Sequence, residues 1–287
     1  MANLKEIRAR ISSVGSTMQI TSAMKMVSAA KLKRAQDAIL QMRPYSDKLT
    51  ELLNNLISSI DSSENNVYTK KRKIKNVLLV TITSNRGLCG GFNSFIIKQT
   101  KTLIKNEYKN TNVSILSIGK KSSEHFAKNS FNVVGTYDEL LSDITYDGTC
   151  EIAEKIMTEF VDGKYDKIVL VYNQFKNAAT QIVMSENFLP LKKGEKTQER
   201  PFNYIFEPNQ ESIVEELIPR SLKTQLFKAV LDSNASEHGA RMTAMHKATD
   251  NASELKKELT LTYNKARQAA ITGEILEIVG GAEALKG

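Results

Sequence analysis

The stretch that decides the fold runs from Ser236 to Leu285 and reads SEHGARMTAMHKATDNASELKKELTLTYNKARQAAITGEILEIVGGAEAL. It contains no proline, and one set of its positions alternates steps of three and four residues. These positions are Met245, Ala248, Ala252, Leu255, Leu259, Thr262, Ala266, Ala269, Gly273 and Leu276. Such a heptad seam predicts a long helix that packs against a partner helix. Because Ala or Gly fills half of the seam, the two backbones can come close, and the product is a slim shaft rather than a catalytic pocket.

The N-terminal segment carries a matching pattern and supplies the partner helix. Its seam consists of Leu4, Ile7, Ile11, Val14, Met18, Thr21, Lys25, Ser28, Leu32, Ala35, Ile39, Met42, Ser46, Leu49, Leu53, Leu56 and Ile60. A helix over this range would be roughly 85 Å long at about 1.5 Å per residue, longer than a small globular domain is wide. Pro44 lacks a backbone donor and should bend or interrupt this helix near Arg43.

Three consecutive positions of the N-terminal seam, Thr21, Lys25 and Ser28, are polar. A buried lysine in a seam costs stability and can fix the register of the helix pair. The alternative is that the pair has separated there, so that Lys25 faces a third partner. Met24 and Met26 lie beside Lys25, and methionine either makes adaptable contacts at a surface that repacks or simply fills gaps in a core.

Between the two seams the periodicity changes to alternating strands and helices. Strands are expected at residues 76–83, 112–119, 131–136, 166–172 and 180–189, and helices at 94–106, 120–129 and 148–162. This alternation is typical of βαβ units with a mostly parallel sheet. The predicted fold is an antiparallel, left-handed coiled coil of the N- and C-terminal helices, with a Rossmann-like α/β domain inserted between them. The expected domains are residues 1–60, 74–207 and 208–287.

A glycine-rich turn, SNRGLCGGFN at Ser84 to Asn93, follows the first strand and precedes a helix. This is the layout of a phosphate-binding loop, but neither GxxxxGK[ST] nor GxGxxG is present. The glycines are therefore expected to permit a tight strand-to-helix turn. The basic run KKRK at residues 70–73 either binds phosphate or is a solvated approach to the strand.

Composition excludes several classes of protein. The two cysteines, Cys89 and Cys150, match no metal-ligand spacing and no disulfide framework, which favours a reducing compartment. The longest apolar run is too short to span a bilayer, and no signal peptide is expected. The three histidines, His125, His238 and His246, lack metal-ligand spacing, and no nucleophile, base and orienting group can be assembled from sequence spacing. No catalytic site, metal or cofactor is expected.

The net charge of +8 leaves two other classes of function open. One is a basic coiled-coil protein that binds nucleic acid, with an affinity that falls steeply with salt. The other is a nucleotide-dependent enzyme housed in the α/β domain, which would bind its ligand as an isolated chain.

Three signatures occur in one order on this architecture: ITSAMKMVSAAKLKRAQ at residues 20–36, SNRGLCGGFN, and SEHGARMTAMHKATDNA with LTYNKARQAAITGEILEIVGGAEAL. With these, the chain closely resembles the gamma subunit of F-type ATP synthase along its whole length. The resemblance implies a central-stalk rotor that transmits torque between proton flow through the membrane c ring and ATP synthesis or hydrolysis at the beta subunits. The implied partners are the alpha and beta subunits, the epsilon subunit and the c ring, and not nucleic acid. The implied location is the cytoplasmic face of a bacterial inner membrane, reached only through those partners.

The resemblance also implies which residues meet these partners. Contacts with the beta subunits would fall to Met24, Lys25, Arg267 and Gln268. The apolar end from Ile275 to Leu285, including Leu276, Ile278 and Val279, would be a tip that turns in a sleeve. Tyr204, Ile205 and Phe206 would form a foot that faces the c ring and the epsilon subunit. The inserted loop with a regulatory cysteine pair found in chloroplast-type relatives is missing, which argues against thiol control.

Overall fold

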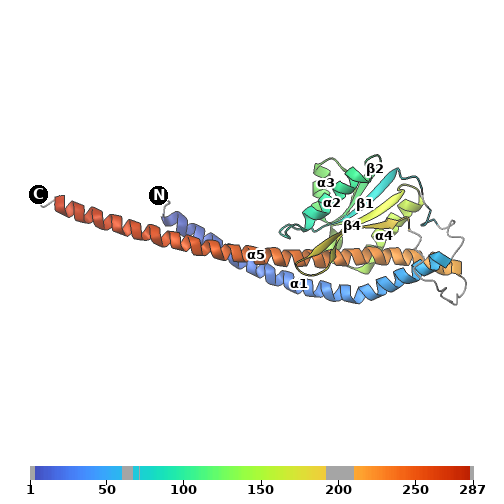
Figure 1. Ribbon diagram of the computed structural model, residues 1–287, viewed down its shortest axis with the longest axis horizontal. Helices are drawn as coiled ribbons and strands as arrows, with labels where there is room; N and C mark the ends of the chain where they lie inside the picture. Colours follow the sequence, from blue (N-terminus) through green and yellow to red (C-terminus); the bar gives the residue numbers. More distant parts are fainter. Residues whose placement is uncertain (1–3, 60–66, 71, 192–209, 285–287) are drawn as a thin grey trace. The chain divides into compact units, whose positions relative to one another are not determined.

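The computed structural model describes residues 4–59, 67–70, 72–191 and 210–284 (Figure 1). Two long helices, α1 (Leu4–Ser59) and α5 (Gln210–Ala284), flank an α/β region in the sequence. The chain divides into two compact units, which we call the helix-pair unit (1–27 and 242–287) and the sheet unit (28–241). Each long helix contributes one part to each unit. The domain boundaries expected at residue 60 and at residues 207 and 208 lie outside the described residues.

The sheet unit contains a five-stranded sheet in the order β3-β2-β1-β4-β5. Its strands are β1 (Asn76–Ile82), β2 (Asn112–Ile118), β3 (Asn132–Thr136), β4 (Lys167–Phe175) and β5 (Gln181–Leu189). The first four are parallel, as the sequence predicts, whereas β5 runs antiparallel to β4. The reason is the short connection between β4 and β5, which can form a hairpin but not the crossover that a parallel pair requires.

Helices cover both faces of this sheet (Figure 1). They are α2 (Phe92–Asn106), α3 (Lys120–Lys128) and α4 (Tyr146–Val161), with a short 3-10 helix at Glu139–Leu141. Alternate residues of the central strand point to opposite faces: Val77 and Leu79 pack with α2, while Leu78 and Val80 pack with α4 and α5. Burial on both faces explains why β1 is continuously apolar.

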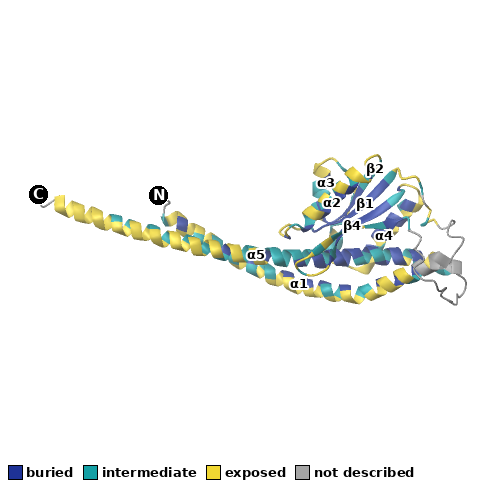
Figure 2. Ribbon diagram, in the orientation of Figure 1, coloured by how far each residue is buried: buried dark blue, intermediate teal, exposed yellow. Residues whose placement is uncertain are grey.

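The first part of α5 forms the floor of the larger core. Ile218, Leu222 and Leu226 recur on one face of the helix and are fully buried against the sheet and α4 (Figure 2). Within the sheet unit α1 packs on α5 in the antiparallel sense. Lys228 pairs with Asp47, and four residues further along α5 Asp232 pairs with Arg43, four residues earlier on α1.

The N-terminal seam is confirmed wherever its side chains are described. Every predicted position from Leu4 to Leu53 is buried or half-buried, while the side chains of Leu56 and Ile60 lie outside the described residues. Of the two effects expected of Pro44, a bend or an interruption, the interruption does not occur, because α1 continues through it. Ile39 and Leu49 are buried on either side of Pro44, and this packing offsets the loss of one backbone hydrogen bond.

Candidate functional site

The helix-pair unit is built from the start of α1 and the end of α5. Arg8 donates a hydrogen bond of 2.5 Å to the Tyr263 hydroxyl and lies 5.5 Å from the centre of its ring. Thirteen residues further along α1, the Thr21 hydroxyl accepts a 2.8 Å hydrogen bond from Thr249. Because α1 advances while α5 retreats by nearly the same number of residues, the two helices are antiparallel, as predicted.

The register of the α5 seam differs in part from the predicted one. Met245, Ala252, Leu259, Ala266 and Gly273 are buried or half-buried, as expected. Of the positions between them, Ala248 is half-buried as expected, but Leu255, Thr262, Ala269 and Leu276 are exposed. Thr249, Lys256, Tyr263 and Ala270, each one residue beyond a predicted position, are half-buried. Steps of three and four residues still alternate, which keeps the spacing of a left-handed coiled coil.

Amphipathic side chains explain the shift. Lys256 and Tyr263 can lay their apolar parts along the partner helix and keep their polar ends accessible. Lys256 reaches Gly15 on α1, where a side-chain β-carbon would lie 3.8 Å from its Nζ. An apolar residue such as Leu255, 45% exposed, is consequently left outside the seam.

The polar part of the α1 seam is packed rather than separated at Thr21. That side chain is only 8% exposed and is bonded to Thr249. Met24 and Lys25, one turn further on, are half-buried, whereas Met26 is 65% exposed. At Thr21 these observations favour the reading in which a polar residue fixes the register of the pair. For Lys25 both readings stay open.

Most of the α5 ribbon in the helix-pair unit is coloured as exposed in Figure 2. Large apolar side chains are among the exposed residues of this unit, away from its seam. They are Ile20, Met26, Val27, Leu255, Leu261, Ile271, Ile275, Leu276, Ile278 and Val279. Ile271, Ile275 and Ile278 lie on one face of α5 in successive turns. Every described residue from Glu274 to Ala284 is exposed. Apolar surface of this extent marks a contact with another protein or a membrane.

The predicted partner contacts involve other chains, so the structure of this chain does not test them. Arg267 and Gln268 are exposed on adjacent positions of α5 and point to different sides of it. Ile275, Leu276, Ile278 and Val279 are between 53% and 71% exposed, as a partner-facing tip requires. The predicted foot, Tyr204, Ile205 and Phe206, lies outside the described residues, as does Leu285.

Ser84, Cys89 and Asn93 bond to one another within the glycine-rich turn between β1 and α2. The Ser84 hydroxyl donates to the Arg86 carbonyl over 2.7 Å and accepts from the Asn93 amide over 2.7 Å. Asn93 also donates to the buried Cys89 sulfur over 3.3 Å. Burial raises the pKa of this thiol. The turn joins the end of β1 to the start of α2 tightly, as expected from the sequence.

Sequence reasoning missed what holds this turn from outside. Arg241 on α5 donates to the Gly87 carbonyl over 2.9 Å and pairs with Glu237 over 2.5 Å. The turn therefore presents a carbonyl to a guanidinium, the opposite polarity to a phosphate-binding loop. Arg241 lies within the SEHGARMTA signature, but nothing in its local spacing points to a loop 154 residues away.

The described ranges contain no group of three or more His, Cys, Asp or Glu side chains that could hold a metal ion. None of their helices combines the length and the apolar character that crossing a membrane requires. The basic run before β1 has a structural contact: Arg72 donates to the Phe160 carbonyl over 3.0 Å and lies over the Phe160 ring.

Comparison with known proteins identifies the family of this chain. The family model described as ATP synthase matches residues 3–285. The ATP synthase gamma chain of Christiangramia forsetii is 58% identical over 287 residues, and that of Flavobacterium johnsoniae is 60% identical over 289, each with 100% of both chains covered.

Solved structures give the same result for the fold. A chain of the central stalk and c ring structure of Tetrahymena thermophila mitochondrial ATP synthase is 26% identical, with a TM-score of 0.60 over 80% of this chain and 99% of that one. A chain of the Euglena gracilis mitochondrial enzyme, 22% identical, has a TM-score of 0.71 over 98% of this chain and 94% of that one, which shows the fold alone. By its sequence, this chain belongs to the ATP synthase gamma chain family.

Proposed function

We propose that this chain is the central-stalk rotor subunit of an F-type ATP synthase. The observation that carries the proposal is the antiparallel helix pair, whose seam is filled by small and amphipathic residues and whose outer face is apolar and exposed. A tight seam resists unwinding under torque, and an exposed apolar face suits a rod that is surrounded by other subunits. The relatives named gamma chain support the same role.

The mechanism rests on asymmetry. One rod inside a ring of alternating alpha and beta subunits contacts the three beta subunits differently, so it biases their conformations and nucleotide affinities unequally. Proton flow through the c ring supplies about 2.3 kcal/mol per charge and 100 mV, which the rod transmits by rotating. Run in reverse, ATP hydrolysis at the beta subunits turns the same rod.

Each predicted residue has a place in this scheme. Met24 and Lys25 contact the lower loops of the beta subunits, and Arg267 offers a forked donor to a beta carboxylate beside Gln268. The apolar tip, which includes Ile275 and the three apolar residues that follow it, turns in an apolar sleeve. The foot at residues 204–206 faces the c ring and the epsilon subunit.

The chain itself supplies no catalytic group in this proposal and uses no cofactor, because the nucleotide sites belong to the beta subunits. It is held at the membrane through the c ring and the epsilon subunit, on the cytoplasmic face of a bacterial inner membrane. A role in nucleic-acid binding is set aside, since none of the related proteins supports it.

The test is a reconstitution in vesicles of all the other subunits of an F-type ATP synthase, with and without this chain. We expect ATP-driven proton pumping only when this chain is present, and no ATP hydrolysis by the chain alone. Arg267→Ala should slow rotation, while Lys265→Ala, an exposed basic residue two positions away, serves as the matched control. Pumping without the chain would overturn the proposal, and equal rates for both variants would remove Arg267 from the contacts.

A further inference from the structure

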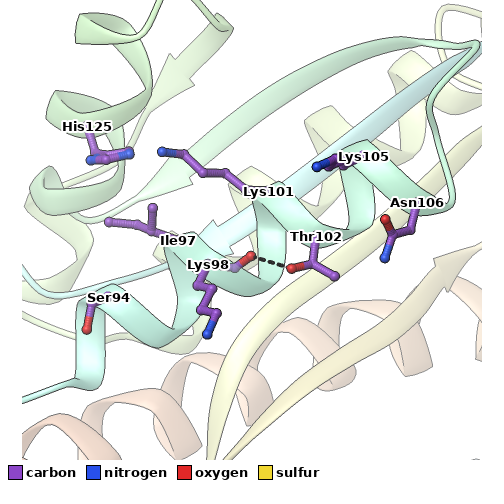
Figure 3. A pocket seen from close by; sticks show the side chains of 8 residues that line it. All are labelled: Ser94, Ile97, Lys98, Lys101, Thr102, Lys105, Asn106 and His125. Carbon is purple, nitrogen blue, oxygen red and sulfur yellow. Dashed lines mark hydrogen bonds between the residues drawn. The ribbon is translucent and has the colours of Figure 1, made fainter.

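An open cavity of about 490 Å³ lies between α2 and α3 in the sheet unit, apart from the helix pair (Figure 3). Seven of its eight lining residues come from α2, and His125 comes from α3. The lining residues are Ser94, Ile97, Lys98, Lys101, Thr102, Lys105, Asn106 and His125. Its size falls within the range of about 300–1,000 Å³ that is typical of small-ligand sites.

The charge of this cavity is of one sign. Three lysines line it, and none of its lining residues is acidic. Within the described part of the chain, no carboxylate lies within 4.0 Å of the ammonium group of Lys98, Lys101 or Lys105. Like charges one turn apart on a helix repel each other. A bound anion would relieve this repulsion.

The donors that remain for a ligand can be counted. The hydroxyl hydrogens of Ser94 and Thr102 are already donated to the carbonyls of Gly91 and Lys98, each over 2.9 Å. The Thr102 bond is visible in Figure 3. The donors left are the three ammonium groups and the Asn106 amide, to which a protonated His125 would add a charged donor. This set suits an acceptor-rich anion.

The pKa of the His125 imidazole depends on the burial and the charge of the cavity. Burial and the Lys101 ammonium lower the pKa of its imidazole, and Figure 3 shows the Lys101 side chain extending toward the ring. On its own helix the charges nearest in sequence are Glu124, paired with Lys121 over 2.8 Å, and Lys128. An anion beside Lys101 would stabilise the imidazolium and raise the His125 pKa.

We propose that the α2–α3 cavity binds an anion that carries two or more linked phosphoryl groups. Lysine recognises phosphate as a point charge, and the three ammonium groups belong to residues spread over two helical turns, about 10 Å at about 1.5 Å per residue. That span exceeds one phosphate and fits a short chain of them. The anion comes either from solution, as a free polyphosphate or the phosphate chain of a nucleotide, or from a phospholipid headgroup.

The experiment uses the purified full-length chain at constant ionic strength and follows the His125 imidazole signals by NMR. Pyrophosphate and tripolyphosphate are titrated in one series, and vesicles with or without a diphosphorylated anionic phospholipid in another. We expect a saturable shift of the His125 signals and a raised His125 pKa in at least one series. Saturation with free anions assigns the solution source, and saturation only with the phosphorylated vesicles assigns the lipid source.

A matched pair of variants separates this cavity from general electrostatics. The triple variant K98Q/K101Q/K105Q should weaken binding at least tenfold. The triple variant K31Q/K75Q/K176Q removes the same charge from exposed lysines of the sheet unit that belong neither to the cavity nor to the basic run at residues 70–73, and should leave binding nearly unchanged. The proposal is overturned if neither series saturates, or if both triple variants weaken binding equally. Far-UV circular dichroism confirms that both variants are folded.

Discussion

The carboxylate of Asp232 on α5 lies 2.9 Å from the guanidinium of Arg43 on α1, and both side chains also hold the end of β4. Arg43 donates to the Phe175 carbonyl over 2.8 Å, and the Phe175 amide donates to Asp232 over 3.4 Å. The Asp232 side chain is fully buried. Burial raises the pKa of its carboxyl, against the opposing effect of Arg43. One ion pair thus joins three elements of the sheet unit.

Arg43→Leu should destabilise the sheet unit by about 3–5 kcal/mol, because it leaves a buried carboxylate without its partner. One oxygen of Asp232 already lacks a hydrogen-bond donor among the described residues, so the loss of Arg43 leaves the Phe175 amide as the donor to this carboxylate. Urea unfolding measures the loss. Asp232→Asn in the same background should recover part of it, since the amide carries no charge.

The control for this pair is Lys228→Ala, which breaks the ion pair between Lys228 and Asp47 one turn away. The Asp47 side chain is 67% exposed, so the expected loss is about 0–1 kcal/mol. If the Arg43 and Lys228 variants unfold at the same urea concentration, the buried ion pair contributes no more to the free energy of unfolding than the exposed one.

The ion pair of Arg241 and Glu237 predicts a second effect, on the glycine-rich turn. Burial raises the pKa of Glu237 while Arg241 opposes this, so Arg241→Ala should raise that pKa further and release the Gly87 carbonyl. We expect faster amide hydrogen exchange at residues 84–93 and a loss of about 2–4 kcal/mol in the free energy of unfolding.

Two further variants make this prediction specific. Glu237→Gln combined with Arg241→Ala should restore part of the stability but not the protection of the turn, since the hydrogen bond to Gly87 is still missing. Arg241→Lys keeps the charge but loses the guanidinium fork. Unchanged exchange at the turn in Arg241→Ala would show that the internal network of Ser84 and Asn93 holds it alone.

The spacing of apolar residues along the chain predicted the helices and strands whose buried faces follow that spacing. The whole described α1 seam follows from the recurrence of apolar residues, and so do the strands and helices of the sheet unit. Four of the ten predicted positions of the α5 seam were misplaced, Leu255 among them, because Leu255 is more apolar than Lys256 although Lys256 is the residue that packs against α1. The same hydrophobic criterion cannot place Arg43 beside Asp232, since a contact between residues 189 apart depends on the tertiary fold. The predicted partner contacts depend on surfaces of other chains, so no property of this chain alone fixes them.

Gly15 offers a stabilising change in the helix-pair unit. An added β-carbon would lie 3.8 Å from the flexible end of Lys256, an ordinary contact, and alanine has a higher helix propensity than glycine. Gly15→Ala should therefore raise stability by about 0.5–1 kcal/mol, measured by thermal unfolding followed at 222 nm. Gly119→Ala is the contrast: its φ is +106° and the β-carbon would meet the Thr83 carbonyl, so that variant should lose stability. A lower melting temperature for Gly15→Ala would mean that the seam has no room for a methyl group.

His238 predicts a dependence of stability on pH. Burial, with Lys31 and Arg241 nearby, lowers its pKa from 6.5 to about 4, and its Nδ1 is buried without a partner among the described residues. Below pH 6.5 the unfolded chain takes up a proton that the folded chain refuses, so this contribution to stability is lost as the pH falls from 6.5 to about 4. The contribution of His238 to stability is at most about 3 kcal/mol. Partial exposure of the ring to water makes it smaller. His238→Gln should flatten the urea-unfolding profile in this range. A profile unchanged by His238→Gln would assign the pH dependence to other groups.

Leu259 and Leu255 lie one turn apart on α5. Leucine-to-lysine substitution tests the seam with α1 at Leu259 and the contact with other subunits at Leu255. Leu259 is half-buried in the seam, so Leu259→Lys should destabilise the helix pair by about 1–3 kcal/mol in the isolated chain, because it places a charge among packed side chains. Leu255 is 45% exposed, so Leu255→Lys should change the stability of the isolated chain by less than about 0.5 kcal/mol. In the reconstituted enzyme, however, both should reduce ATP-driven proton pumping: the first through a loosened rod, the second through a lost apolar contact with the surrounding subunits. If Leu255→Lys destabilises the isolated chain as much as Leu259→Lys does, the seam runs through Leu255, as its hydrophobicity suggests. If Leu255→Lys leaves pumping intact, the exposed leucine faces solvent in the assembled enzyme rather than a partner.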